Sequence, residues 1–265
     1  MGSAHPGVLI QRPDDEPHVA ELVLDRSEAL NAISTAQAES ITAAAADVAA
    51  DRTVRAIVLS SSVEKAFCVG ADLKERNSLT DDELLRQRII TRAAYTSVQE
   101  LPVPVVAAVH GYALGGGCEL ALACDLIVAD ESAVFGLPEV SVGVIPGGGG
   151  TQLLARRLGW GRAADLIFTA RQVDAAEAYR LGLADRLVPA GSARDEAIGL
   201  AATIARHSPV GVRNAKQAMR LGLDVPLSAG LEIEDARWRA TAFSGDRREG
   251  IAAFNDKRTP AWPGE

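Results

Sequence analysis

The stretch "GYALGGGCELALACDL" (residues 111–126) places three consecutive glycines before an apolar segment that carries one carboxylate, Glu119. Glycine loses more backbone entropy on folding than any other residue, and a carboxylate among alanines and leucines is costly to desolvate. Residues 103–111 form the apolar, β-branched run typical of a buried strand, and the residues after the glycines predict a helix. The two costs indicate that this strand–glycine–helix turn serves a purpose beyond folding.

A second turn of the same kind lies in "KAFCVGADLKE" (65–75), where an apolar piece ends at Gly70 and a helical turn begins. The first N–H groups of a helix have no partner inside it, and the helix dipole adds positive potential there. If the fold brings the two turns together, the amides of Ala71 and Gly116 would form an oxyanion hole. Spacing alone leaves open the alternative that both glycine runs only let strands turn tightly. A third run, "IPGGGGTQ" (145–152), lacks the GK[ST] ending of a phosphate loop.

Two glutamates stand near these turns. Glu119 follows Gly116 by three residues, in the first turn of the expected helix, and Glu139 follows a proline whose fixed φ can hold the next residue in place. Together they could position one water molecule and move its protons. The alternative, in which each is a solvated or capping glutamate, stays open at this point. Asp125 and Asp130 bracket a short strand and are expected to be turn acids.

The composition limits the possible partners. The chain has 265 residues and a net charge of −8, whereas a nucleic-acid or anionic-membrane surface needs a basic field. Its three cysteines show neither CxxC nor zinc spacing, so we expect buried, reduced thiols and no metal site. There is no signal region and no run of eighteen apolar residues, which predicts a cytoplasmic protein.

Periodicity predicts an α/β first part followed by a helical last third. Strands are expected at 18–24, 54–60 and 103–111, helices at 33–50 and 79–101, and two short extended pieces within 125–140. Ser34 with Gln37 and Thr80 with Glu83 have the spacing of capping boxes. Beyond Thr151, six segments read as helices: 151–170, 174–182, 195–208, 210–222, 231–245 and 246–258.

Five segments, in this order and spacing, resemble the crotonase superfamily, also called the enoyl-CoA hydratase/isomerase superfamily. They are "LDRSEALNAIS" (24–34), "AFCVGADLKE" (66–75), "PVVAAVHGYALGGGCELALACDLIVA" (104–129), "FGLPEVSVGVIPGGGGTQLL" (135–154) and "DRREGIAAFNDKR" (246–258). The resemblance implies an α/β fold in which repeated ββα turns wind into a spiral. It further implies a core domain over residues 1–195 that holds an acyl-CoA site. A helical region over 196–265 would drive formation of a homotrimer, two of which stack into a homohexamer.

The resemblance also implies roles for individual residues. Glu119 and Glu139 would be catalytic, and the amides of Ala71 and Gly116 would bind the thioester oxygen of an acyl-CoA. Coenzyme A would lie along 26–32 and 70–74, with Lys74 as a phosphate partner and Lys257 reaching the coenzyme A of a neighbouring subunit. The substrate-binding residues expected on this basis are Arg26, Glu28, Ala29, Gly70, Asp72, Leu73, Lys74, Gly115, Pro138, Gly147 and Lys257. Coenzyme A belongs to the substrate, and no metal or redox cofactor is expected.

The activity that this resemblance favours is hydration of the C2–C3 double bond of a trans-2-enoyl-CoA. Glu119 would assist attack of water at C3, and Glu139 would deliver a proton to C2. Enoyl-CoA isomerisation and dehydration of a specialised acyl-CoA are the alternatives within the superfamily. A non-catalytic acyl-CoA-binding protein is a further alternative, but it would be expected to lose one of the glutamates.

Departures from the family pattern at Ser27, Val69 and Gly148 remove no catalytic group. Gly148 stands where the family often has alanine, and this departure is expected to be tolerated. Val69 is larger than the residue usual at its position and would narrow the space near the thioester. His110 is expected to be structural.

Overall fold

The structure, a computed structural model, describes residues 4–265 and contains two β-sheets. The larger sheet has the strand order β1-β2-β3-β4-β6-β8-β11. Strands β1 to β3 pair antiparallel, and β3 through β11 pair parallel. The bounds of its strands are β1 Ala4–His5, β2 Val8–Gln11, β3 Val19–Leu24, β4 Ala56–Ser61, β6 Val105–Val109, β8 Leu126–Asp130 and β11 Arg186–Val188.

The smaller sheet has the strand order β10-β9-β7-β5. Its strands are β5 Ala66–Cys68, β7 Tyr112–Leu114, β9 Val134–Gly136 and β10 Gln172–Asp174. Strands β5, β7 and β9 run parallel, and β10 is antiparallel to β9. The ends of the three parallel strands therefore meet at one edge, which brings together the chain segments that follow them.

The chain alternates between the two sheets, which confirms the predicted spiral of ββα turns. A strand of the large sheet is followed by a strand of the small sheet and then by helix: β4–β5–α2–α3, β6–β7–α4 and β8–β9–α5. The first six helices are α1 Thr35–Ala50, α2 Leu73–Arg76, α3 Asp81–Gln99, α4 Gly116–Ala123, α5 Gly150–Leu158 and α6 Trp160–Thr169. The remaining helices are α7 Ala175–Leu181, α8 Ala193–Ala205, α9 Pro209–Gly222, α10 Leu227–Ala242 and α11 Gly245–Asn255. Two short 3-10 helices, η1 Ser27–Ala29 and η2 Pro138–Val142, complete the elements.

One of the two expected capping boxes is complete. At the start of α3, the Thr80 side chain accepts the Glu83 amide while the Glu83 carboxylate accepts the Thr80 amide. At the start of α1, Ser34 accepts the Gln37 amide, but the Gln37 side chain donates to the carbonyl of Gly7 at 2.8 Å. The second cap is therefore one-sided, because Gln37 ties α1 to the N-terminal hairpin instead.

The elements that periodicity missed are short. The continuous helix expected over 151–170 is two helices, because Gly159 adopts a φ of +80° between α5 and α6. Strands β1, β2, β7, β10 and β11 were not expected, and each has two to four residues. Such segments are too short for an alternating apolar and polar pattern to be recognised. Their pairing depends on strands that are distant in sequence.

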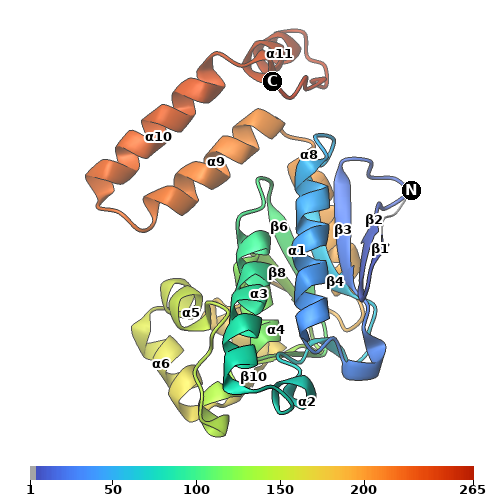
Figure 1. The fold of residues 1–265 in the computed structure, drawn as a ribbon. Coiled ribbons are helices and arrows are strands. Elements are labelled where there is room, and N and C mark those ends of the chain that lie inside the picture. Colours follow the sequence, from blue (N-terminus) through green and yellow to red (C-terminus); the bar gives the residue numbers. More distant parts are fainter. Residues whose placement is uncertain (1–3) are drawn as a thin grey trace.

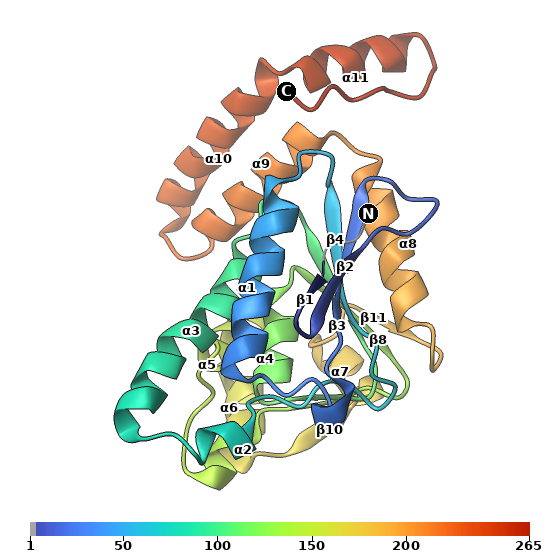
Figure 2. The same cartoon turned by 45° about the vertical axis from the view of Figure 1, so that its right-hand side comes forward.

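The large sheet separates two layers of core (Figure 2). Along β4, Ile57 and Leu59 face a cluster that includes residues of α1, α3 and α4, whereas Ala56 and Val58 face α8. All four side chains are at most 1% exposed. Because both faces are covered, the central parallel strands are mostly apolar, as the sequence predicts.

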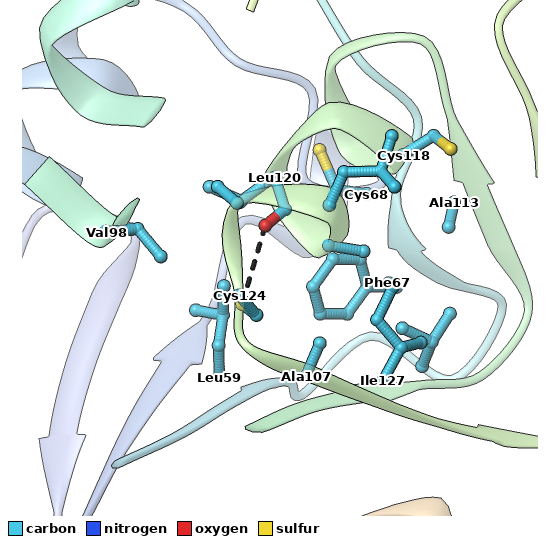
Figure 3. Close-up of a cluster of buried hydrophobic side chains, with 14 of the residues drawn as sticks. Leu59, Phe67, Cys68, Val98, Ala107, Ala113, Cys118, Leu120, Cys124 and Ile127 are labelled. Carbon is cyan, nitrogen blue, oxygen red and sulfur yellow. Dashed lines mark hydrogen bonds between the residues drawn. The ribbon is translucent and has the colours of Figure 1, made fainter. Parts of the chain in front are cut away.

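The larger core cluster includes Cys68, Ala113 and Cys118, which flank the glycine-rich turns in the sequence (Figure 3). It contains Phe67 at its centre and the three cysteines, Cys68, Cys118 and Cys124, none of which forms a disulfide. Burial raises the pKa of the Cys68 thiol to about 12. The expectation of buried, reduced thiols is confirmed.

Helices α9 to α11 project from the sheet layers at one end of the molecule (Figure 1). Helix α8, in which the expected domain boundary at 195 falls, packs on the large sheet. The projecting helices begin at α9, which is attached through Asp125, whose carboxylate accepts from Lys216 at 2.7 Å and from Arg220 at 2.9 Å. No helix in residues 4–265 is both long enough and apolar enough to cross a membrane.

Candidate active site

The two glycine-rich turns lie against each other. Gly70 has a φ of +92°, and a Cβ atom there would lie 2.7 Å from the carbonyl oxygen of Leu114 and 3.0 Å from the Gly116 nitrogen. A Cβ atom on Gly117 would lie 1.9 Å from the carbonyl oxygen of Cys68. Only glycine permits this approach, because any larger residue would push the end of β5 away from the start of α4.

The backbone of these turns leaves two N–H groups available on neighbouring segments. Ile33 donates its amide to Gly70 at 2.7 Å and accepts the amide of Asp72 at 3.0 Å. Successive N–H groups of an extended chain point to opposite sides, so the Ala71 N–H points away from Ile33. Gly116 is the first residue of α4, and its N–H has no partner within the helix. This arrangement could hold one carbonyl oxygen.

Glu119 lies in the first turn of α4, where its side chain is 3% exposed. Its Oε1 atom accepts the amides of Gly148 at 2.6 Å and Gly150 at 2.8 Å. Burial raises the pKa of Glu119 above its ordinary value, and the two amide bonds oppose that effect because they stabilise the ionised form. The fourfold glycine run thus binds a carboxylate of the protein itself.

Glu139 approaches the same region from η2, which begins at Pro138. A Cβ atom on Gly115 would lie 3.0 Å from its Oε1 atom, so the carboxylate faces the turn that precedes α4. Its Oε2 atom is buried and has no hydrogen-bond partner in the described part of the chain. Burial, with a contribution from the charge of Glu119, raises the pKa of Glu139 to about 7.

Tyr95 contacts these parts of the site, and no sequence motif pointed to it. The side chain comes from α3, is 6% exposed and lies where Cβ atoms on Gly116 and Gly148 would be 2.3 Å from its hydroxyl oxygen and 2.7 Å from its ring. Its position in a helical apolar pattern indicates only a core residue. The glycine at 148, which departs from the family's usual alanine, fits this arrangement, because Tyr95 and Glu119 occupy the space that a Cβ atom there would need.

The two segments expected to bind coenzyme A lie side by side. Arg26 forms an ion pair with Asp72 at 2.8 Å and donates to the carbonyl of Ala32 at 2.7 Å. Asp72 also caps α2, where it accepts the amides of Lys74 and Glu75. Arg26 and Asp72 therefore brace residues 26–32 against 70–74, and the N–H bonds and the Arg26 ion pair lower the pKa of Asp72 despite its burial.

The other expected substrate residues divide by location. Leu73 and Lys74 are exposed on α2, where Leu73, Lys74, Arg76 and Asn77 line a shallow pocket. Glu28 and Ala29 lie in η1, and Gly147 accepts a hydrogen bond from Arg88. Lys257 follows α11, at the opposite end of the molecule from α2 (Figures 1 and 2), so within one chain it does not join the others.

Asn31 is a second residue that periodicity could not find. It is fully buried with a φ of +57°, and its side chain donates to Ser61 at 2.8 Å and to the carbonyl of Phe67 at 2.9 Å. Its Oδ1 atom accepts the amide of Arg26 at 2.8 Å. Asn31 therefore fixes the 26–32 segment on the strand that leads into the first glycine turn. His110 bonds the carbonyl of Val63 at 2.9 Å, in line with a structural role.

The spiral of ββα turns, with two glycine turns meeting below a pair of glutamates, is a crotonase-type architecture. The sequence profile of the enoyl-CoA hydratase/isomerase family matches residues 14–265. This chain belongs to the enoyl-CoA hydratase/isomerase family.

Individual relatives are similar over nearly their full lengths. The Bacillus subtilis protein YngF is 42% identical over 247 residues, which cover 93% of this chain and 95% of that protein. Enoyl-CoA hydratase domain-containing protein 2 of Bos taurus is 42% identical over 253 residues, 93% of this chain and 85% of the relative. The crystal structure of enoyl-CoA hydratase from Bacillus anthracis superposes with a TM-score of 0.95 at 40% identity and covers 98% of this chain and all of that one.

Proposed function

We propose that this protein hydrates trans-2-enoyl-CoA thioesters to 3-hydroxyacyl-CoA. The observation that carries the proposal is the unequal pair of carboxylates beside the glycine turns. Glu119 accepts two amide hydrogens, whereas the buried Oε2 atom of Glu139 accepts none. The two amides thus stabilise the ionised form of Glu119. Burial without a donor at Oε2 stabilises the protonated form of Glu139.

This inequality assigns the proton transfers. Ionised Glu119 accepts a proton from water as the oxygen attacks C3, and protonated Glu139 donates a proton to C2. In the transition state, negative charge develops on the thioester oxygen, where the amides of Ala71 and Gly116 would stabilise it. Two carboxylates whose surroundings separate their pKa values are the usual way to run acid and base chemistry at one pH. Coenzyme A enters as part of the substrate.

Product mass separates hydration from its alternative, isomerisation. The purified protein would be incubated with crotonyl-CoA and, separately, with trans-3-hexenoyl-CoA. We expect crotonyl-CoA to gain one water and 3-hexenoyl-CoA to remain unchanged. Conversion of 3-hexenoyl-CoA to an isomer of equal mass, without hydration of crotonyl-CoA, would replace the proposal with an isomerase. Binding of both thioesters without turnover would indicate an acyl-CoA-binding protein.

We also propose that the protein forms homotrimers through its projecting helices, and hexamers from two trimers. Helices α9 to α11 expose large apolar side chains, which soluble monomers rarely gather in one region. They include Met219 at 76%, Leu227 at 77%, Phe243 at 80% and Phe254 at 84% exposed. Light scattering is expected to give three or six times the chain mass of 27.7 kDa, and a monomer would contradict this proposal.

A further inference from the structure

Several elements beside the candidate active site carry buried polar atoms that have no hydrogen-bond partner among the described residues. In residues 4–265, four buried side-chain nitrogen or oxygen atoms have no hydrogen-bond partner: Arg76 Nε, Gln87 Oε1, Glu139 Oε2 and Arg213 Nε. Buried polar atoms are nearly always paired, so each exception calls for an explanation. The first three belong to α2, α3 and η2, the elements that enclose the candidate active site.

The first two of these atoms lie at one junction between helices. The Gln87 side chain donates to Glu75 at 2.8 Å and to Thr35 at 2.9 Å, which ties α3 to α2 immediately before Arg76. Arg76 forms no ion pair within the described residues. Burial raises the pKa of Glu139, and the charge of Arg76 acts in the opposite direction, although no hydrogen bond joins the two side chains within the described residues.

A second guanidinium near this junction belongs to Arg88 of α3. Arg88 follows Gln87 directly, and its Nη2 atom donates to the carbonyl of Gly147 at 2.5 Å. That carbonyl belongs to the loop whose next amide binds Glu119. Arg88 also forms no ion pair with another part of the described chain, and its charge lowers the pKa of Glu119. Arg76 and Arg88 thus follow the bonded pair Glu75 and Gln87, beside the loop that binds Glu119, and neither forms an ion pair within the described residues.

We infer that the site takes an enoyl-CoA whose acyl group ends in a carboxylate, which Arg76 and Arg88 bind. The inference rests on the proposed function and narrows its substrate class. A guanidinium presents its N–H groups in a planar fork that matches a carboxylate, and such charge-assisted bonds are the strong ones. A neutral alkyl chain would remove water from the exposed part of the Arg76 guanidinium and offer it no acceptor, which is costly. The same two groups would therefore favour an acyl chain that ends in a carboxylate over a neutral chain of the same length.

The test compares two thioesters of equal length. One is trans-2-pentenedioyl-CoA, which ends in a carboxylate, and the other is trans-2-pentenoyl-CoA, which ends in a methyl group. We expect kcat/KM to be at least about tenfold higher for the carboxylated substrate, the effect of one or two charge-assisted hydrogen bonds. In Arg76→Gln this ratio should fall by about tenfold or more. Arg92→Gln removes a charge one turn along α3 and should leave the ratio unchanged.

Binding of saturated thioesters provides a readout that does not depend on turnover. Pentanedioyl-CoA and pentanoyl-CoA carry the same coenzyme A phosphates, and only the first carries an acyl carboxylate. We expect Arg76→Gln to weaken binding of pentanedioyl-CoA selectively. Equal weakening of both would show that Arg76 binds a coenzyme A phosphate, and this would overturn the inference.

The outcomes separate this inference from the proposed function. Hydration of trans-2-pentenedioyl-CoA and trans-2-pentenoyl-CoA with equal kcat/KM would overturn the carboxylate site and leave the proposed hydratase activity intact. Selective binding of pentanedioyl-CoA without hydration of either substrate would uphold the site and overturn the proposed reaction. Equal binding of the two saturated thioesters without hydration would overturn both.

Discussion

The Oε1 atom of Glu119 accepts the backbone amide of Gly148 at 2.6 Å, so a glycine loop fixes the position of a buried carboxylate from a different element. The loop can approach only because residue 148 lacks a side chain. A Cβ atom there would lie 2.8 Å from Glu119 Oε2 as well as 2.7 Å from the ring of Tyr95. In the proposed mechanism, the geometry of this contact determines where Glu119 holds the attacking water molecule.

Gly148→Ala is therefore expected to lower kcat by about 10- to 100-fold, because small displacements of catalytic groups have effects of this size. Steady-state kinetics with crotonyl-CoA measure this decrease in kcat. The double variant Gly148→Ala/Tyr95→Ala removes the ring that meets the new methyl group and should recover part of the loss. A single variant with full activity would show that the loop shifts without consequence for Glu119.

Gly117→Ala tests the contact between the two glycine turns. Its methyl group would overlap the carbonyl of Cys68, and relief requires β5 to move away from α4. We expect the free energy of unfolding to fall by about 3 kcal/mol, at the upper end of the range for overpacking. Binding of the thioester should weaken as well. Gly199→Ala is the matched control, since that glycine lies within α8 with open space around it. It should raise stability by about 0.5–1 kcal/mol. Equal stability of the two variants would contradict the close approach of the turns.

The pH dependence of kcat/KM should be bell-shaped. Activity requires ionised Glu119 and protonated Glu139, so the basic limb reflects loss of the Glu139 proton at a pH of about 7. The acidic limb reflects protonation of Glu119 and should lie above 4.5, because burial raises its pKa. The two carboxylates interact, so the limbs report the pair. Activity that stays constant from about pH 6 to pH 9 would contradict the assignment of Glu139 as the acid.

Glu139→Gln should stabilise the fold in neutral and basic solution. The folded protein binds the Glu139 proton more tightly than the unfolded chain, with a pKa of about 7 against 4.5. The wild type therefore loses free energy of unfolding as the pH rises from 4.5 to 7, and the glutamine variant does not. The gain at about pH 8 should be about 1–2 kcal/mol, reduced from the full linkage value because the group is partly exposed. It should vanish near about pH 4, and an equal gain at both pH values would contradict the burial of this carboxylate.

The sequence allowed prediction of those parts of the site that depend on local chemistry. The glycine turns at 70 and 116 and the glutamates at 119 and 139 stand out because each is costly in its local surroundings. Tyr95 and Arg76 do not, because their roles arise from contacts between α3, α2 and loops distant in sequence. The close surroundings of Gly148 could not be predicted for the same reason, since Tyr95 and Glu119 come from other elements. The short strands of the small sheet were missed because only their neighbours define them.

The most direct test of the central claim is the rate of crotonyl-CoA hydration in Glu119→Gln and Glu139→Gln, with thioester binding measured on the same samples. Each variant is expected to lose about 10²–10⁴-fold in kcat, the usual contribution of a positioned acid or base, while butanoyl-CoA still binds. Retention of the wild-type rate in either variant, with binding intact, would contradict hydration by a pair of glutamates.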